Sequence, residues 1–295
     1  MSDYIVMKPV ELSATCAAFR KKYPTYQSLV DAGYWLQRKY DGCCGVAVFA
    51  PGQPAKMLSR TGEDYSVSCR LILEQLEDKL GGQACVVIGE VWHPSWDFPK
   101  ISGRFRQQRE AEPELTFRAF DMLPWTAYVN GVWNEPYSLR FRSMVDQGLP
   151  VVDTKPGLLG LPSTIDLAVK WKLEGGYDGA VLRDPNAGYI CADAKLGQAI
   201  KVKPVMSLDL RVTAVSVEKR PTKLGGYLTV QLPDGQYNDV GSGLTQAHLT
   251  GFLTELEARL WVNQIAEIEF MGYQPDGKLR EPRFKGLRFD KTKPD

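Results

Sequence analysis

The chain has 295 residues, of which 44% are hydrophobic and 24% are charged, and its formal net charge is +1. This composition excludes a disordered chain and a uniformly basic nucleic-acid-binding protein. No apolar run approaches the roughly 18 residues of a membrane span, and the N-terminus has no basic region followed by an apolar one. We therefore expect a cytosolic protein of two domains that does not contact a membrane.

The cysteines and histidines argue against a zinc site built by the protein. The six cysteines form no C-x-x-C pair, and the two histidines, His93 and His248, are not spaced as H-E-x-x-H. We expect free thiols in a reducing compartment. If a metal is used, Mg²⁺ arriving with phosphate groups is the best candidate.

The sequence of residues 1–204 predicts helices mixed with short strands. Apolar residues at steps of three or four predict helices over residues 11–23, 68–80, 136–147 and 163–173. Short apolar runs bounded by glycine or proline predict strands over residues 35–40, 44–49, 56–60, 84–92, 115–122, 179–183 and 199–203. The polar, proline-bearing segment 93–114 is expected to be a long excursion outside the core.

The pattern changes after Pro204, where we place the domain boundary. Beyond it the sequence predicts a helix over residues 245–260 and strands over residues 208–217, 227–232, 237–240 and 265–271. Short strands and one helix within about 90 residues are typical of a five-stranded OB-fold β-barrel. We thus expect an α+β protein, with antiparallel sheets and flanking helices in residues 1–204 and an OB fold in residues 205–295.

Lys39 is the candidate nucleophile, and the other candidate site residues are considered in relation to it. It ends a predicted strand in Lys39-Tyr40-Asp41-Gly42, directly before a turn and a second apolar strand. A lysine attacks phosphorus only when it is neutral, so we expect neighbouring cations or burial to lower its pKa. Lys201 and Lys203 alternate with apolar residues and share one strand face, which suits a phosphate, although an exposed edge strand would show the same pattern.

Five other residues attract attention because each is a polar or aromatic side chain in or at the end of an apolar strand. Arg60 would lie at the same end of the sheet as Lys39 if the hairpins are regular, and its fork suits phosphate or a ribose hydroxyl. Glu90 is out of place in an apolar strand unless it binds ribose, a metal or a cation. Phe120 is either a core aromatic, which we favour from the sequence, or a surface for a base. Asp178 and Arg183 stand at opposite ends of a short apolar strand.

Two stretches could contact phosphate groups from outside the site. Residues 278–294 hold seven basic residues against two acidic ones, which indicates phosphate contact and a solvated surface about equally. Residues 96–106 interleave aromatic and basic side chains, and there we predict that Arg104 and Arg106 contact DNA. A solvated loop is the alternative.

The order of these motifs resembles the covalent nucleotidyltransferase superfamily of ATP-dependent DNA ligases, RNA ligases and mRNA capping enzymes. The resemblance spans residues 34–291 and is greatest to the short phage-type ATP-dependent DNA ligases. The motifs that carry it are Lys39-Tyr40-Asp41-Gly42, Arg60, Gly89-Glu90, Phe120-Asp121, Asp178-Gly179 to Arg183, Lys201-Val202-Lys203 and Arg288 to Lys291.

The resemblance implies a role for each nucleotide-site residue. Lys39 would become the lysyl-adenylate. Arg60 and Glu90 would hold the ribose and phosphate, and Phe120 would stack on adenine. Gln37 stands where this group often has a glutamate that reads the adenine amino group, so base recognition is altered there or shared with the backbone. Residues facing the phosphates would be Arg183, Lys201 and Lys203.

The metal site and one phosphate contact depart from the family pattern. The resemblance implies Mg²⁺ at Glu90 and Asp178, but Asp178 stands where the family usually has a glutamate, and Glu174 is a less well-registered alternative. Cys44 stands where many members have an arginine, so that phosphate contact is missing or replaced.

The C-terminal element Arg288, Asp290 and Lys291 matches the R-x-D-K tail that orients the departing pyrophosphate in DNA ligases and capping enzymes. The resemblance therefore implies a monomeric enzyme that uses ATP and Mg²⁺ to seal nicked double-stranded DNA. The alternatives are an mRNA capping guanylyltransferase, which shares the lysine and the tail, and a catalytically inactive nucleic-acid-binding relative, for which Cys44 and Asp178 are the motivating departures.

Overall fold

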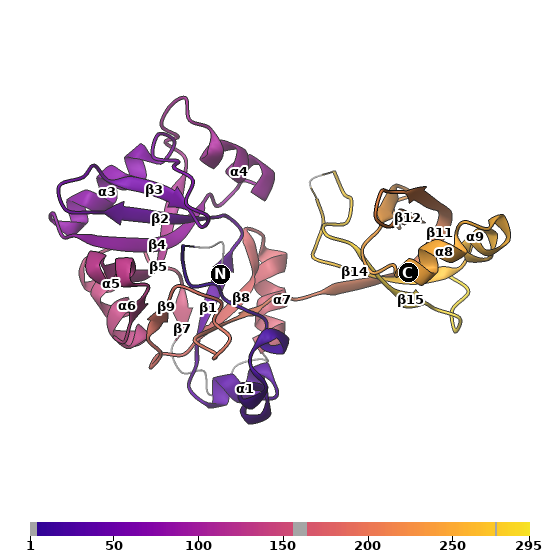
Figure 1. Ribbon diagram of the computed structural model, residues 1–295, viewed down its shortest axis with the longest axis horizontal. Coiled ribbons are helices and arrows are strands. Elements are labelled where there is room, and N and C mark those ends of the chain that lie inside the picture. Colours follow the sequence, from indigo (N-terminus) through magenta and orange to yellow (C-terminus); the bar gives the residue numbers. More distant parts are fainter. Residues whose placement is uncertain (1–4, 156–163, 275) are drawn as a thin grey trace. The chain divides into compact units, whose positions relative to one another are not determined.

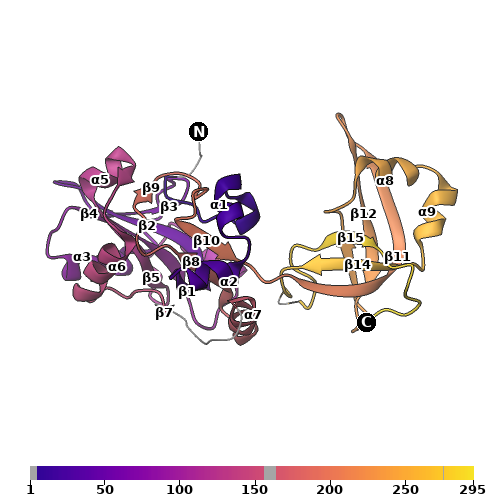
Figure 2. The ribbon, with the colours of Figure 1, turned by 90° about the horizontal axis from the view of Figure 1, so that it is seen from below.

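The computed structural model describes residues 5–155, 164–274 and 276–295. The chain divides into two compact units, Met1–Pro204 and Val205–Asp295 (Figures 1 and 2). Antiparallel sheets with helices beside them build the first unit, and a single five-stranded sheet with two helices builds the second. No helix among the described residues is both long and apolar enough to cross a membrane.

Two four-stranded antiparallel sheets frame the first unit. Sheet I has the order β10-β8-β1-β7, with bounds Ala199–Val202, Tyr177–Arg183, Trp35–Tyr40 and Thr154–Lys155. Sheet II has the order β3-β2-β4-β5, with bounds Lys56–Ser59, Cys43–Phe49, Cys85–Trp92 and Thr116–Pro124. The short strands β6 (Val132–Trp133) and β9 (Tyr189–Ile190) pair separately.

The expectation of regular hairpins from β1 through β3 is wrong, because β1 and β2 belong to different sheets. Only Asp41 and Gly42 separate these two strands. The side chains of β1 alternate between two faces: Leu36 faces the core between sheet I and its helices, whereas Gln37 and Lys39 point to the other side. Lys39 therefore stands at the crossing between the two sheets.

The predicted helices of the first unit are mostly present. The helices are η1 (Leu12–Ala14), α1 (Ala17–Lys22), α2 (Tyr26–Asp31), α3 (Arg70–Leu80), α4 (Phe98–Arg106), α5 (Trp125–Asn130), α6 (Tyr137–Asp146) and α7 (Thr164–Glu174). The single helix expected over residues 11–23 is wrong. The Thr15 hydroxyl donates to the Leu12 carbonyl at 2.7 Å and both Thr15 and Cys16 are extended, which ends η1 before α1 begins. Residue 163 of the predicted helix 163–173 lies outside the described residues.

Segment 93–114 was expected to lie outside the core, but it contains α4. The Asp97 carboxylate caps this helix by accepting from the Lys100 amide at 2.8 Å. Ile101 and Phe105, four residues apart, are fully buried on one face. The sequence pattern hid this helix because only two of its residues reach the core.

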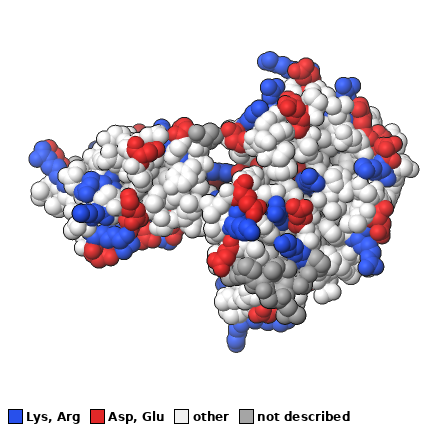
Figure 3. Space-filling model, turned by 180° about the vertical axis from the view of Figure 1, so that it is seen from behind, with Lys and Arg blue, Asp and Glu red and all other residues white. Residues whose placement is uncertain are grey.

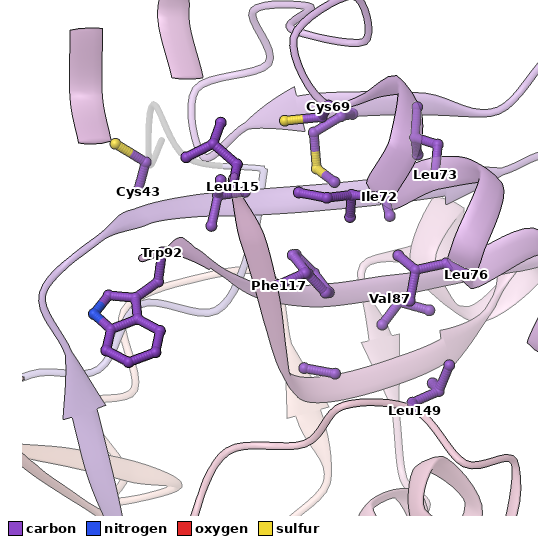
Figure 4. Close-up of a cluster of buried hydrophobic side chains, with 14 of the residues drawn as sticks. Cys43, Cys69, Ile72, Leu73, Leu76, Val87, Trp92, Leu115, Phe117 and Leu149 are labelled. Atoms are coloured by element: carbon purple, nitrogen blue, oxygen red, sulfur yellow. The ribbon is translucent and has the colours of Figure 1, made fainter. Parts of the chain in front are cut away.

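Three apolar clusters stabilise the first unit. One packs α3 and α4 against sheet II and includes Leu76, Val87 and Phe117 (Figure 4). The second covers the helical side of sheet I with Leu36, Leu182 and Ile200. The third joins the facing sides of the two sheets, where Val46, Val86 and Ile88 of sheet II meet Val181 and Ala199 of sheet I. The polar residues that continue these two facing sides therefore lie between the sheets.

The second unit has the sheet order β13-β12-β11-β14-β15. The bounds are β11 (Met206–Lys219), β12 (Leu224–Gln231), β13 (Tyr237–Val240), β14 (Ile265–Phe270) and β15 (Arg283–Leu287). A parallel bridge between Ser242 and Arg283 brings the two edges of the sheet together at one point. This strand order confirms the OB-type topology, in its partly open form rather than as a closed barrel.

The single helix predicted over residues 245–260 is wrong. The chain forms α8 (Gln246–Gly251) and α9 (Glu255–Trp261) instead. The helix-breaking Gly251 ends the first, and the hydroxyl of Thr254 donates back to the Gly251 carbonyl at 2.9 Å while Thr254 itself is extended. Strand β15 was also missed, because its apolar residues are few.

We expect that Phe105→Ala destabilises the first unit by about 3 to 5 kcal/mol, because it removes a buried ring from the cluster beneath α4. The free energy of unfolding, measured by urea denaturation with tryptophan fluorescence, tests this. Leu139→Ala is the matched control, since Leu139 is exposed. Equal losses in the two variants would contradict the assignment of α4 to the core.

Candidate active site

Gly42 allows the chain to cross tightly from sheet I to sheet II. Its amide donates to Oε1 of Glu90 at 3.2 Å. A Cβ added at Gly42 would lie 2.3 Å from the Val91 carbonyl oxygen and 2.9 Å from Cγ of Glu90. The glycine of the Lys39-Tyr40-Asp41-Gly42 motif is thus required by close approach to β4. This contact holds the end of β1 beside Glu90.

A β-bulge places Asp178 directly against Lys39. In the β1–β8 pairing Lys39 lies opposite Gly179 and Tyr40 lies opposite Tyr177, so Asp178 is the extra residue. Oδ2 of Asp178 lies 2.9 Å from Nζ of Lys39 and 2.7 Å from Nζ of Lys203. We call Lys39, Asp178 and Lys203 the lysine clamp. Glu174, the alternative to Asp178, instead pairs with Arg38 at 3.5 Å.

The electrostatics of the lysine clamp differ from the expectation that the pKa of Lys39 is lowered. Burial does disfavour the ammonium form, but the carboxylates of Asp178 and Glu90 outweigh it and raise the pKa of Lys39. Burial also opposes ionisation of Asp178, yet Lys39 and Lys203 lower the pKa of Asp178 to about 2. The clamp therefore holds Lys39 as an ammonium.

Glu90 and Cys44 form the opposite wall of the site. They are direct cross-strand partners on β4 and β2. Burial raises the pKa of Glu90 to about 7, although Lys39 and the Gly42 amide favour its charged form. Burial likewise raises the pKa of Cys44, and Glu90, Arg60 and Lys39 all act on that thiol. The Cys44 side chain thus lies among three predicted site residues.

Lys201 and Lys203 do not converge on one group. Lys201 lies on β10 and Lys203 directly follows the end of that strand, and Nζ of Lys201 lies 3.4 Å from Oε1 of Glu11. Lys203 belongs to the lysine clamp. Each cation is therefore already paired with a different carboxylate.

Gln37, Phe120 and Arg183 gather behind Lys39. The buried amide of Gln37 donates to the Tyr137 hydroxyl at 2.7 Å and to the Thr154 hydroxyl at 2.9 Å. The guanidinium of Arg183 lies over the rings of Tyr137 and Phe120, with centroids at 4.8 and 5.5 Å. Arg183 is four residues along β8 from the partner of Lys39, or about 13 Å at the rise of a strand. The structure does not bring it to Lys39.

Asp121 explains why Arg183 is buried. Asp121 forms a bidentate pair with Arg140, at 2.7 and 3.0 Å, and also lies 3.6 Å from Nη1 of Arg183. All three side chains are almost fully buried. This group is a polar core that ties α6 to both sheets.

The other first-unit arginines predicted to contact ligands lie at the surface. Arg60 is exposed at the end of β3 in sheet II. Arg104 and Arg106 are exposed on the last turn of α4, and Arg104 pairs with Glu112 at 3.3 Å. On the face shown in Figure 3, basic and acidic side chains are intermingled. Any DNA contact there would depend on individual side chains.

The tail residues form an ion network within the second unit. The guanidinium of Arg288 binds Asp290 through two bonds of 3.0 and 2.9 Å and lies 3.1 Å from Oδ2 of Asp209. Lys291 pairs with the same Asp209 oxygen and, at 3.3 Å, with Asp295. Asp209 is buried on β11. It therefore anchors both cations of the tail element.

Sequence reasoning missed Tyr137, Thr154, Arg140 and Asp209. The sequence did carry a signal for Asp209, because it is a lone acid between two leucines of an apolar strand. Glu90 is likewise a lone acid in the apolar strand β4. Tyr137 and Arg140 lie in the predicted helix 136–147 and Thr154 lies outside any predicted element, but only the tertiary fold brings these three residues to Gln37 and Asp121.

The acidic residues near Lys39 fit a divalent cation only in the presence of phosphate. Among the described residues no three His, Cys, Asp or Glu side chains gather into a metal-binding cluster. Glu90 and Asp178 both act on the charge of Lys39, so two carboxylates flank this lysine. Mg²⁺ is commonly bound by one or two carboxylates together with substrate phosphates, and this donor set suits that mode.

We expect Glu90 to make stability depend on pH. Between about pH 4.5 and 7 the folded chain keeps a proton on Glu90 that the unfolded chain releases, so this group stabilises the fold at low pH and the contribution is lost as pH rises through 7. Glu90→Gln removes the titration. Its free energy of unfolding, relative to the unsubstituted protein, should therefore be higher near pH 8 than near pH 5. A difference that does not change with pH would contradict this, and Glu77→Gln on α3 is the exposed control.

Comparison with known proteins points to one group of enzymes. No protein-family model matches the chain. A DNA ligase of Methanococcoides burtonii is 26% identical over 297 residues, covering 87% of this chain and 51% of the relative. A DNA ligase of Halobacterium salinarum is also 26% identical, covering 87% of this chain and 52% of the relative. The chain spans about half the length of the curated relatives it matches.

Solved structures show the same fold. A structure from a study of Lig E DNA ligases superimposes with a TM-score of 0.67 at 18% identity, covering 96% of this chain and 100% of the other. The ATP-dependent DNA ligase of bacteriophage T7 in complex with ATP superimposes with a TM-score of 0.52 at 16% identity, covering 96% and 98%. The chain therefore shares the fold of these two DNA ligase structures and is similar in sequence to the DNA ligases of Methanococcoides burtonii and Halobacterium salinarum.

Proposed function

We propose that the chain is an ATP-dependent DNA ligase that seals nicked duplex DNA through a covalent lysyl-AMP intermediate. The observation that carries the proposal is the lysine clamp with Glu90: a strand-end lysine, fixed by a bulge and flanked by two carboxylates and a second lysine. The sequence similarity to archaeal DNA ligases and the shared fold support it. In this account residues 1–204 are the adenylation domain and residues 205–295 are the OB domain.

In the first step Nζ of Lys39 attacks the α-phosphate of ATP. A bond forms between nitrogen and phosphorus, and the bond to the departing pyrophosphate breaks. Mg²⁺, held by Glu90 and Asp178 together with the phosphates, would supply positive charge that offsets these carboxylates and the phosphate oxygens. With the carboxylates offset, burial is the dominant influence on Lys39 and favours release of the ammonium proton to solvent, which leaves the neutral amine that attacks. The nitrogen releases a second proton to solvent as the phosphoramidate forms.

Lys203 and Lys201 then supply the positive charge that stabilises the reacting phosphates. Lys203 shares the Asp178 oxygen with Lys39, so phosphate binding can replace this carboxylate as its partner without moving the lysine far. Lys201 is paired with the half-exposed Glu11 and can exchange that partner for phosphate. We assign to Arg288, Asp290 and Lys291 the orientation of the leaving pyrophosphate.

The two later steps use the same site. AMP passes from Lys39 to the 5′-phosphate at the nick, which breaks the bond between nitrogen and phosphorus. The neighbouring 3′-hydroxyl then attacks that phosphate and displaces AMP, which seals the strand. The direct contact between Asp178 and Lys39 speaks against an inactive relative, because the shorter acid still reaches the nucleophile.

We expect Lys39→Ala to abolish formation of the covalent adenylate while keeping the ability to seal a nick whose 5′-phosphate already carries AMP. Only the first two steps need the amine. Gel assays with labelled ATP and with a preadenylated nicked duplex measure the two activities. Lys195→Ala, which removes an exposed lysine of the same unit, is the control and should keep both. Labelling of Lys39→Ala by ATP would contradict the proposal.

Replacing Arg104 and Arg106 together with Ala should weaken binding to nicked DNA and leave self-adenylation unchanged. If both side chains contact phosphates, the slope of log affinity against log salt should fall by about two. Exposed Arg70 and Arg142, replaced together, provide the matched control. Nick affinity that is unchanged in a protein of normal melting temperature would show that α4 does not contact DNA.

A further inference from the structure

Residues 5–11 connect the two sheets of the first unit along one edge, and we call this segment the strap. At its start the Ile5 amide donates to the carbonyl of Arg60, directly after β3 of sheet II, at 2.9 Å. At its end the Val10 carbonyl accepts from the amide of Lys201, on β10 of sheet I, at 2.9 Å. Because β3 and β10 are edge strands of their sheets, the strap closes this side of the space between the sheets.

The middle of the strap is buried and hydrogen-bonded. Val6 and Met7 are 5% and 6% exposed and belong to the third core cluster, which joins the facing sides of the two sheets. The Lys8 amide donates to the Ala192 carbonyl at 3.0 Å, and the Lys8 carbonyl accepts from the Ala194 amide at 2.9 Å. A segment with a buried middle and backbone bonds along its length has little freedom to open locally. The strap therefore holds its last residue in a fixed place.

That last residue, Glu11, is held beside Lys201. A parallel bridge pairs Val10 with Ile200, so the next residue of each segment, Glu11 and Lys201, also lie next to each other. Oε1 of Glu11 lies 3.4 Å from Nζ of Lys201. The side chains are 48% and 26% exposed, respectively, so water and ions can reach the pair. Backbone pairing thus builds an ion pair that can open without disturbing the core.

Lys201 faces the same side of sheet I as Lys39. The cross-strand partner of Lys201 is Val181 on β8, and the partner of Val181 on β1 is Gln37. Direct cross-strand partners share a face of a sheet, and Gln37 shares that face with Lys39, two residues along β1. Glu11 therefore neutralises a cation on the face of the sheet that carries the candidate nucleophile.

We propose that Glu11 competes with the nucleotide for Lys201 and so limits how tightly the site binds ATP. This inference rests on the proposed function, in which Lys201 faces a nucleotide phosphate. Lys201 can hold that phosphate only after it has released the Glu11 carboxylate. Because the strap keeps this carboxylate beside Lys201, the competitor is present at a high effective concentration. Glu11 acts through Lys201 and does not touch the reacting atoms.

Glu11 can be removed without altering the lysine clamp. Asp178, the partner of Lys203, also contacts Lys39, so its replacement would change the nucleophile itself. Glu11 pairs instead with Lys201, outside the clamp. The effect of a competing carboxylate on ATP binding can therefore be measured at Glu11 alone.

The test measures the KM for ATP and the saturating rate of self-adenylation in the full chain, with and without Glu11→Gln. Glutamine keeps the size of the side chain and removes its charge. We expect the KM to fall about two- to fivefold, which corresponds to the contribution of an exposed ion pair. The saturating rate should not change, because the pair is already broken when ATP is bound. The gain should shrink at high salt, which screens an exposed pair.

Glu114→Gln is the matched control, since it removes an exposed acid between α4 and β5 and changes the net charge equally. It should leave the KM unchanged. An equal fall of the KM in this variant would overturn the inference, because net charge alone would then explain the gain.

The remaining outcomes separate this inference from the proposed function. If the unsubstituted protein forms no adenylate with ATP, the proposed function fails and the inference fails with it. If it forms the adenylate and Glu11→Gln keeps or raises the KM at normal melting temperature, only the inference is overturned. A purely structural role of Glu11 predicts this second outcome, because a loosened strap would not improve ATP binding.

Discussion

One carboxylate oxygen, Oδ2 of Asp178, is shared by the ammonium groups of Lys39 and Lys203, and the arrangement of the site depends on it. Asp178 is nearly buried, and a buried carboxylate is tolerated only when it is paired. The two lysines meet that need, and in return their side chains are held within hydrogen-bond distance of one atom. Lys39 is therefore held in one position and in its protonated form. The same contact with Asp178 both positions Lys39 and keeps it protonated.

At Gly42 the chain passes from sheet I to sheet II, and this crossing supports the lysine clamp from the side of β4. It sets the end of β1 against β4, so that Glu90 and Asp178, from different sheets, flank one lysine. The facing sides of both sheets are apolar farther in and polar at this end, and the third core cluster holds them together. A site built on two strands and a bulge is more rigid than one built on loops alone. Behind it, the buried Asp121, Arg140 and Arg183 fix α6, which carries Tyr137 to Gln37.

The sequence was sufficient for most strands and for the topology of the second unit. It was insufficient where a single residue decides the geometry. No sequence pattern distinguishes a bulged Asp178 from a regular strand residue. The crossing between the sheets depends on the close approach of Gly42 to the Val91 carbonyl, which a Cβ would block and which only the structure reveals. The expected lowering of the pKa of Lys39 was wrong because strand alternation identified nearby cations but not the carboxylates opposite them. Helices that touch the core with only two residues, such as α4, were missed for a similar reason.

The central claim is that Nζ of Lys39 forms a covalent bond to the phosphorus of AMP. Identifying the residue that carries AMP tests this claim most directly. The protein should be incubated with ATP and Mg²⁺, digested under conditions that preserve a phosphoramidate, and sequenced by tandem mass spectrometry. The account predicts AMP on Lys39, within a peptide that contains Tyr40 and Asp41. AMP on another lysine, such as Lys201 or Lys203, or no adduct at all from folded protein, would contradict it.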